Sequence, residues 1–180
     1  MKEAFTHKSL LILGRGIGQV MFQNNALSGL LMLIGIFLNS WQMGLLAVSG
    51  NIISTLTARI SGYDCDDIKN GLYGFNGTLV GIAVGVFMLL TVSSLMLMAI
   101  ASCASTYIAR FFNMQRMLPG FTTLFILSVW MLLGLCSWLM PDMLLVSDTE
   151  TPASSSINYL QCFSMSIGQV MFQGNIMTGL

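Results

Sequence analysis

Hydrophobic positions in this chain fall into long blocks that are separated by short clusters of charged residues. Between charged residues lie three long uncharged segments, namely 16–58, 70–109 and 117–141, which are 43, 40 and 25 positions long. An α-helix that crosses a bilayer needs about 20 predominantly apolar residues. The three lengths therefore predict two spans, two spans and one span, which makes about five transmembrane helices.

The overall composition agrees with a membrane location. Hydrophobic residues make up 55% of the chain and charged residues 8%, and the mean hydropathy is +0.80. Soluble domains carry about 25% charged residues. We therefore predict an all-α integral membrane protein.

The chain also contains an internal repeat. Segments 17–30 and 167–180 are identical at ten of fourteen positions, including the string Gly-Gln-Val-Met-Phe-Gln. Biased composition can repeat a residue type but not an ordered string, so we expect a duplicated structural unit. Because five spans is an odd number, the second copy would enter the membrane from the opposite side. Inverted repeats of this kind form many transporters, with the substrate site near the midplane between the halves.

These patterns divide the chain into four expected parts. They are a cytoplasmic N-terminal tail (1–15), a first inverted repeat (16–140), an extracytoplasmic linker (141–157) and the start of a second inverted repeat (158–180). An inverted-repeat transporter needs both halves. We therefore expect the 180 residues to be an incomplete form that transports poorly by itself.

The basic residues predict the orientation. All seven Lys and Arg lie in the tail, between 59 and 69 or between 110 and 116, which is one side of a five-span arrangement. Cytoplasmic loops carry the excess of Lys and Arg in membrane proteins. We expect a multi-pass protein of the inner (plasma) membrane with a cytoplasmic N-terminus, and the acidic linker on the other side.

Residues 71–78 do not fit a plain lipid-facing helix. Three glycines and Asn76 fall in this stretch, and we expect a helix break with Asn76 capping a new helix from Gly77. Non-helical backbone at membrane depth persists only where it is buried in protein or lines a cavity. The stretch therefore predicts a re-entrant half-helix, with an interfacial loop as the alternative. Gly77, Gly81 and Gly85 recur every four residues and predict close packing against another helix.

The repeated string places Gln19 and Gln23 four residues apart, which predicts one polar helical face. Such a face is costly in lipid unless it looks into protein or a wet pore. The duplication favours a pore, and amide hydrogen bonds between helices are the alternative. No Asp, Glu, Lys, Arg or His lies inside a predicted span, which excludes a proton relay or a charged partner for an ionic substrate. These observations favour passive passage of a small neutral polar molecule.

Three segments, 16–25, 71–81 and 118–122, resemble in order the signature segments of the urea transporter family, in its bacterial type. The resemblance implies a channel-like facilitator with two inverted five-helix halves, re-entrant half-helices, one pore per subunit and assembly as a homotrimer. In that family planar urea passes through a slot with apolar walls and a ladder of acceptor oxygens. The resemblance assigns nine pore residues: Gln19, Val20 and Phe22 at one mouth, Phe75 and Leu79 beside the slot, Thr122 at the constriction, and Gln169, Val170 and Phe172 at the other mouth.

The resulting functional prediction is passive transport of urea down its gradient. Two alternatives are a permease for another small neutral or ammonia-like solute and a membrane scaffold that transports nothing. An enzyme is not expected, because no acid, base or nucleophile pair is placed for catalysis. The expected partners are urea and the lipid bilayer, with no nucleic acid, and we expect no cofactor and no metal.

Overall fold

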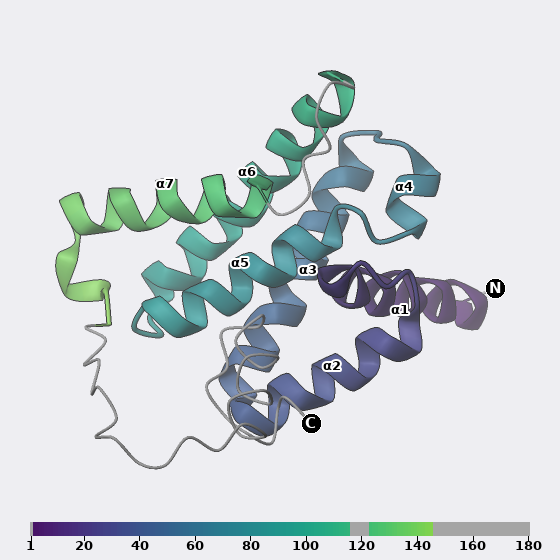
Figure 1. Ribbon diagram of the computed structural model, residues 1–180, viewed down its shortest axis with the longest axis horizontal. Helices are drawn as coiled ribbons and strands as arrows, with labels where there is room; N and C mark the ends of the chain where they lie inside the picture. The colour runs from purple at the N-terminus through teal and green to yellow at the C-terminus, as the bar shows by residue number, and fades with distance from the viewer. Residues whose placement is uncertain (1, 116–122, 146–180) are drawn as a thin grey trace, which may run out of the picture.

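The computed structural model describes residues 2–115 and 123–145. Within these ranges the regular structure is helical except for one isolated bridge between Met88 and Leu144, which confirms the all-helical prediction. The elements are α1 (Lys2–Gly18), η1 (Gln19–Met21), α2 (Ala26–Asn39), α3 (Trp41–Ile60), α4 (Cys65–Lys69), α5 (Gly74–Phe87), α6 (Val92–Gln115), α7 (Thr123–Leu139) and η2 (Pro141–Met143) (Figure 1).

The expectation of about five spans is met only in part. Among the described residues, two helices are long and apolar enough to cross a membrane, namely Trp41–Ile60 and Val92–Phe112. A third span results if Lys8–Met21 and Ala26–Asn39, which meet at 75°, are counted as one bent unit. Helix α5 has 14 residues and is therefore about 21 Å long, against a hydrocarbon core of about 30 Å. Two further apolar helices, Gly74–Phe87 and Thr123–Leu139, are shorter than the length required for a span. The count of five spans therefore stays a prediction.

The N-terminal segment is more ordered than a tail. Helix α1 runs from Lys2 to Gly18, so the predicted boundary between residues 15 and 16 lies inside it. The helix packs against α2 through glycines, since a Cβ atom on Gly14 would lie 3.0 Å from the Ala26 carbonyl oxygen and one on Gly29 of α2 would collide with the Gly14 carbonyl. The division of the chain into inverted repeats stays a prediction.

Helix α5 is the most buried element of the described fold (Figure 1). All residues from 74 to 84 are buried, and α5 lies against α1, α3, α6 and α7. A helix that is apolar and covered on all sides needs small residues where its neighbours come closest. Glycine supplies them at the contact with α3: a Cβ on Gly77 would collide with the Gly50 carbonyl, and one on Gly81 with the Leu46 carbonyl. The predicted packing role of the glycine ridge is confirmed.

A second interface joins α3 to α6 through small polar residues. The Ser54 hydroxyl donates to the Ser102 carbonyl oxygen at 2.9 Å, and the Thr106 hydroxyl donates to the Ser54 carbonyl oxygen at 3.4 Å. All three residues are fully buried. The hydroxyls of Ser54 and Thr106 thereby meet acceptors that lipid would not provide, and the contact holds α6 against the α3–α5 pair.

The glycine contacts generate a stability prediction. Replacing Gly77 by Ala places a methyl group against the Gly50 backbone and the Ser54 hydroxyl, and overpacking of this kind typically costs about 1–3 kcal/mol. We expect a lower midpoint of thermal unfolding in detergent, measured by circular dichroism. The matched control is Gly35→Ala in α2, where a Cβ would meet nothing within 4 Å. Equal midpoints for the two variants would contradict the close approach of α3 and α5.

Candidate functional site

The duplicated string forms a helix break. Helix α1 ends at Gly18, η1 covers residues 19–21, and Phe22 adopts a left-handed conformation with φ of 56°. The chain then turns tightly at Asn24, where the Asn25 N–H donates to the Gln23 carbonyl oxygen at 2.8 Å. The Asn25 side-chain oxygen accepts the Leu27 N–H at 2.9 Å and starts α2. A non-glycine residue in the left-handed region is uncommon and marks a constrained turn. The prediction that Gln19 and Gln23 share one helical face is therefore wrong, because the helix stops between them.

The second break lies between α4 and α5. Gly71 has φ of +77°, a conformation that residues with a side chain rarely adopt. Helix α5 begins at Gly74, with Tyr73 at its N-cap. The break therefore occurs within the predicted stretch but three residues early. The expectation that Asn76 caps a helix from Gly77 is wrong, because Asn76 lies inside the first turn of α5.

Hydrogen bonds join the two breaks. The Gln19 amide nitrogen donates to the Asn70 carbonyl oxygen at 3.0 Å, and the Arg15 guanidinium donates to the Lys69 carbonyl oxygen at 3.2 Å. The Asn24 amide nitrogen donates to the side-chain oxygen of Asn70 at 3.1 Å. These bonds satisfy carbonyls at the C-terminal end of α4, where a helix leaves such groups without intrahelical partners. We call the joined segments, 15–25 and 69–74, the break junction.

Glycines let the two backbones touch at the break junction. A Cβ on Gly71 would lie 2.7 Å from the Arg15 carbonyl carbon, and a Cβ on Gly16 would lie 2.7 Å from the Asn51 amide nitrogen. A larger residue at position 71 would push the breaks apart, whereas one at position 16 would meet the Asn51 side chain of α3. The glycines quoted in the sequence resemblance thus have a direct structural role.

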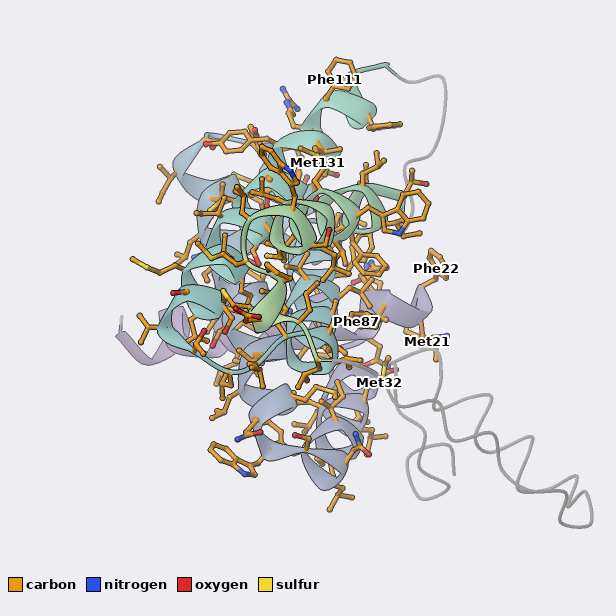
Figure 2. The ribbon with its side chains drawn as sticks, turned by 90° about the vertical axis from the view of Figure 1, so that its left-hand side faces the viewer. Met21, Phe22, Met32, Phe87, Phe111 and Met131 are labelled. Carbon is orange, nitrogen blue, oxygen red and sulfur yellow. The ribbon has the colours of Figure 1, made fainter. Side chains whose placement is uncertain are left out.

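Three of the predicted pore residues belong to one apolar cluster beside the break junction. Val20, Phe75 and Leu79 are 5%, 7% and 3% exposed and lie in the same core cluster. Phe75 and Leu79 are one turn apart on α5, so their side chains share a face of the helix. Phe22, in contrast, is 63% exposed and projects away from the helices beside Met21 (Figure 2). Gln19 lies in the break junction itself. The remaining four predicted residues lie outside the described residues: Thr122, Gln169, Val170 and Phe172.

A polar hub that the sequence analysis missed supports this arrangement. Asn51 of α3 is fully buried, and its amide nitrogen donates to the Leu13 carbonyl oxygen at 3.2 Å and to the Thr78 hydroxyl at 3.0 Å. The Thr55 hydroxyl donates to the Asn51 side-chain oxygen at 3.3 Å, and the Thr78 hydroxyl donates to the Gly74 carbonyl oxygen at 3.1 Å. One amide therefore ties α1, α3 and α5 together. An Asn in the middle of a long uncharged segment was the signal, since such amides usually bond neighbouring helices.

Asn76 provides a contrast with Asn51. It is also fully buried, yet neither its side-chain nitrogen nor its side-chain oxygen has a hydrogen-bond partner within the part of the chain that the structure describes. An unpaired buried amide costs free energy, whereas a paired one stabilises the fold by about 0.5–1.5 kcal/mol per bond. The two asparagines should therefore respond differently to removal of their amides.

Substituting each asparagine by leucine tests the hub. Asn51→Leu removes three side-chain hydrogen bonds at once, and we expect a destabilisation of about 1–3 kcal/mol. Asn76→Leu, the matched control, should be close to neutral or stabilising. The measurement is the denaturant midpoint of each variant in the same detergent. A smaller loss for Asn51→Leu than for Asn76→Leu would contradict the role of Asn51 as the hub.

Comparison with known proteins places these segments in a family. Residues 10–180 match the family model described as "Urea transporter". "Urea transporter 1" of Mus musculus is 44% identical over 73 residues, which are 41% of this chain and 19% of that protein. "Urea transporter 1" of Ovis aries is 41% identical over 73 residues, which are also 41% of this chain and 19% of that protein.

The matched segment spans about a fifth of the length of these curated relatives, 19% in each case. Both are mammalian, so the bacterial type stays a prediction. The match to the family model covers nearly the whole chain and includes both copies of the repeated string. The chain belongs to the urea transporter family, a family of membrane transporters and not of enzymes.

Proposed function

We propose that this chain contributes to passive, channel-like transport of urea across the membrane. The observation that carries the proposal is the family match over residues 10–180, which includes the residues of the break junction. Two relatives that match the chain carry the name "Urea transporter 1". The three long uncharged segments of the chain fit a cargo without net charge.

The physical chemistry of urea fits the residues around the break junction. Urea is planar and neutral, so its faces lose water at little cost against flat apolar walls, while its N–H groups need acceptors at the edges. In the proposal Phe75 and Leu79 supply the wall, and Val20 extends the same apolar cluster toward the mouth. Gln19 is held in place at the mouth by its bond to Asn70.

The charge distribution supports the proposed orientation. Lys8, Arg15, Arg59 and Lys69 line one cavity at the α4 end of the fold. The segment that contains η2, which carries Asp142, lies on the opposite side of Figure 1 from α4. Positive residues collect on the cytoplasmic side of membrane proteins. We propose that the α4 end and the N-terminus face the cytoplasm and that η2 faces the exterior of the inner (plasma) membrane.

The wider architecture is also proposed from the resemblance. The repeated string at 167–173 would build a second mouth with Gln169, Val170 and Phe172, related to the first by an axis in the membrane plane. Thr122 would line the constriction between them. Subunits with one pore each would assemble as a homotrimer.

Substitution of two adjacent threonines, one at a time, tests the proposed urea transport. In protein expressed from its complete gene and reconstituted into liposomes, Thr122→Val should lower the urea permeability about 2–10-fold, because one acceptor for the urea N–H groups is lost. Thr123→Val is the matched control, since Thr123 is exposed at the start of α7. Urea efflux is measured by stopped-flow light scattering and divided by the amount of protein incorporated.

Two results would count against the proposal in different ways, and the flux of other solutes divides the second of them. Equal urea permeability for both variants would show that the Thr122 hydroxyl does not contribute to the urea path. No urea flux above that of empty liposomes would contradict urea transport itself. Flux of ammonia or water without urea would favour the alternative permease, and no flux of any of these solutes would favour a scaffold.

A further inference from the structure

A cavity bordered by four basic residues, with a predominantly apolar inner surface, lies at the α4 end of the fold, away from the apolar cluster of the proposed urea path. It has a volume of about 450 Å³ and is formed by α1, the end of α3 and α4. Its cationic side chains come from all three helices: Lys8, Arg15, Arg59 and Lys69. Leu11, Ile12 and Ile68 supply an apolar floor. We call this cavity the basic pocket.

The charges of the basic pocket are only partly neutralised. Lys69 pairs with Asp66 at 2.8 Å, and this hydrogen bond raises the pKa of Lys69. Asp64 is occupied in capping α4, where its oxygen accepts the N–H groups of Asp66 and Asp67, and these bonds lower its pKa. Burial raises the pKa of Asp67, the remaining acidic residue of α4.

Among the residues whose side chains the structure describes, 8–112 and 123–145, the other cations of the basic pocket have no acidic partner. Within the described ranges, no ion pair engages Lys8, Arg15 or Arg59. Arg15 donates to a backbone carbonyl and keeps its charge uncompensated. Arg110 lies nearby in the fold but stacks on the Tyr63 ring at 5.2 Å and does not line the pocket. The pocket therefore has an excess of positive charge.

An apolar groove continues from the basic pocket along α1. The groove has a volume of about 540 Å³, runs between α1 and α2 and shares Leu11 with the pocket. Its outer side chains Leu10, Leu27 and Leu30 are 62%, 63% and 51% exposed. A cationic site that opens into an exposed apolar groove matches a molecule with an anionic head and a hydrocarbon tail.

We propose that the basic pocket binds the phosphate of an anionic glycerophospholipid, with an acyl chain of the same lipid lying over Leu11 in the α1–α2 groove. Anionic lipids attract basic residues at the cytoplasmic membrane surface, which is the side proposed for α4. A soluble anion would use the cations but not the groove. The proposal does not depend on urea transport, because none of the nine predicted pore residues lines the pocket or the groove.

Binding of defined lipids to the full chain in detergent, measured by native mass spectrometry, tests the proposal. We expect tighter binding of dioleoyl phosphatidylglycerol than of dioleoyl phosphatidylcholine. Arg59→Gln and Lys8→Gln should each weaken phosphatidylglycerol binding about fivefold. Arg110→Gln is the control, since it removes the same charge at the same end of the fold outside the pocket. Lys8 and Arg59 are exposed, so their variants should fold.

The possible outcomes distinguish the phosphate of a lipid from a soluble anion as the group that the basic pocket binds. Equal binding of both lipids would overturn the proposal, because the protein would then not distinguish an anionic headgroup. Equal weakening by Arg59→Gln and Arg110→Gln would also overturn it, because binding would then depend on the general charge of this end of the fold and not on the pocket. Inorganic phosphate in excess should not displace the lipid. Binding of inorganic phosphate that depends on Arg59, without preferential binding of phosphatidylglycerol, would assign the pocket to a soluble anion and also overturn the proposal. Preferential binding of phosphatidylglycerol that Arg59→Gln weakens and Arg110→Gln does not would support it.

Discussion

Hydrogen bonding of interrupted backbone is the constraint on which this structure depends. A membrane offers no water to broken helices, so every N–H and C=O group at a break needs a partner within the protein. The chain interrupts its helices after Gly18 and after Lys69. Gln19 and Arg15 at the first break donate to the Asn70 and Lys69 carbonyls at the second. Side-chain N–H groups at the first break thus supply the hydrogen-bond donors that these carbonyls at the second break lack. Neither break is expected to be stable in isolation.

Close backbone packing keeps the break junction in place. Glycines bring α3 against α5 and the first break against the second, while the Asn51 amide joins α1, α3 and α5 from within. The result is a short, fully covered α5 that holds Phe75 and Leu79 next to Val20. In the proposed function these positions form one side of a slot for a flat neutral molecule. A narrow slot needs rigid walls, and a helix packed on all sides provides one.

The parts of the fold that depend on local spacing could be predicted from the sequence. Glycines four residues apart indicated that another helix packs closely against α5, without identifying it as α3, and the cluster of glycines before Phe75 indicated a break. The break after Gly18 could not be found this way, because the bond from Gln19 to Asn70 connects positions 51 residues apart; the same string read locally predicts an unbroken polar face. Asn51 was missed because the spans were predicted from the positions of charged residues, and a neutral amide inside a span does not change that pattern. The grouping of Val20 with Phe75 and Leu79 was available only through the family resemblance, since periodicity does not relate one helix to another.

The central claim is that the break between α1 and α2 forms a mouth of the urea path. It is tested most directly by blocking that position in protein expressed from its complete gene, with the native cysteines replaced by serine. Phe22→Cys and Leu27→Cys place a thiol at two sites that are each 63% exposed on either side of the α2 N-terminus. Attaching a bulky methanethiosulfonate reagent at position 22 should abolish most urea flux, whereas the same attachment at position 27 should leave it unchanged. Undiminished flux after modification at position 22, or equal block at both positions, would contradict the account.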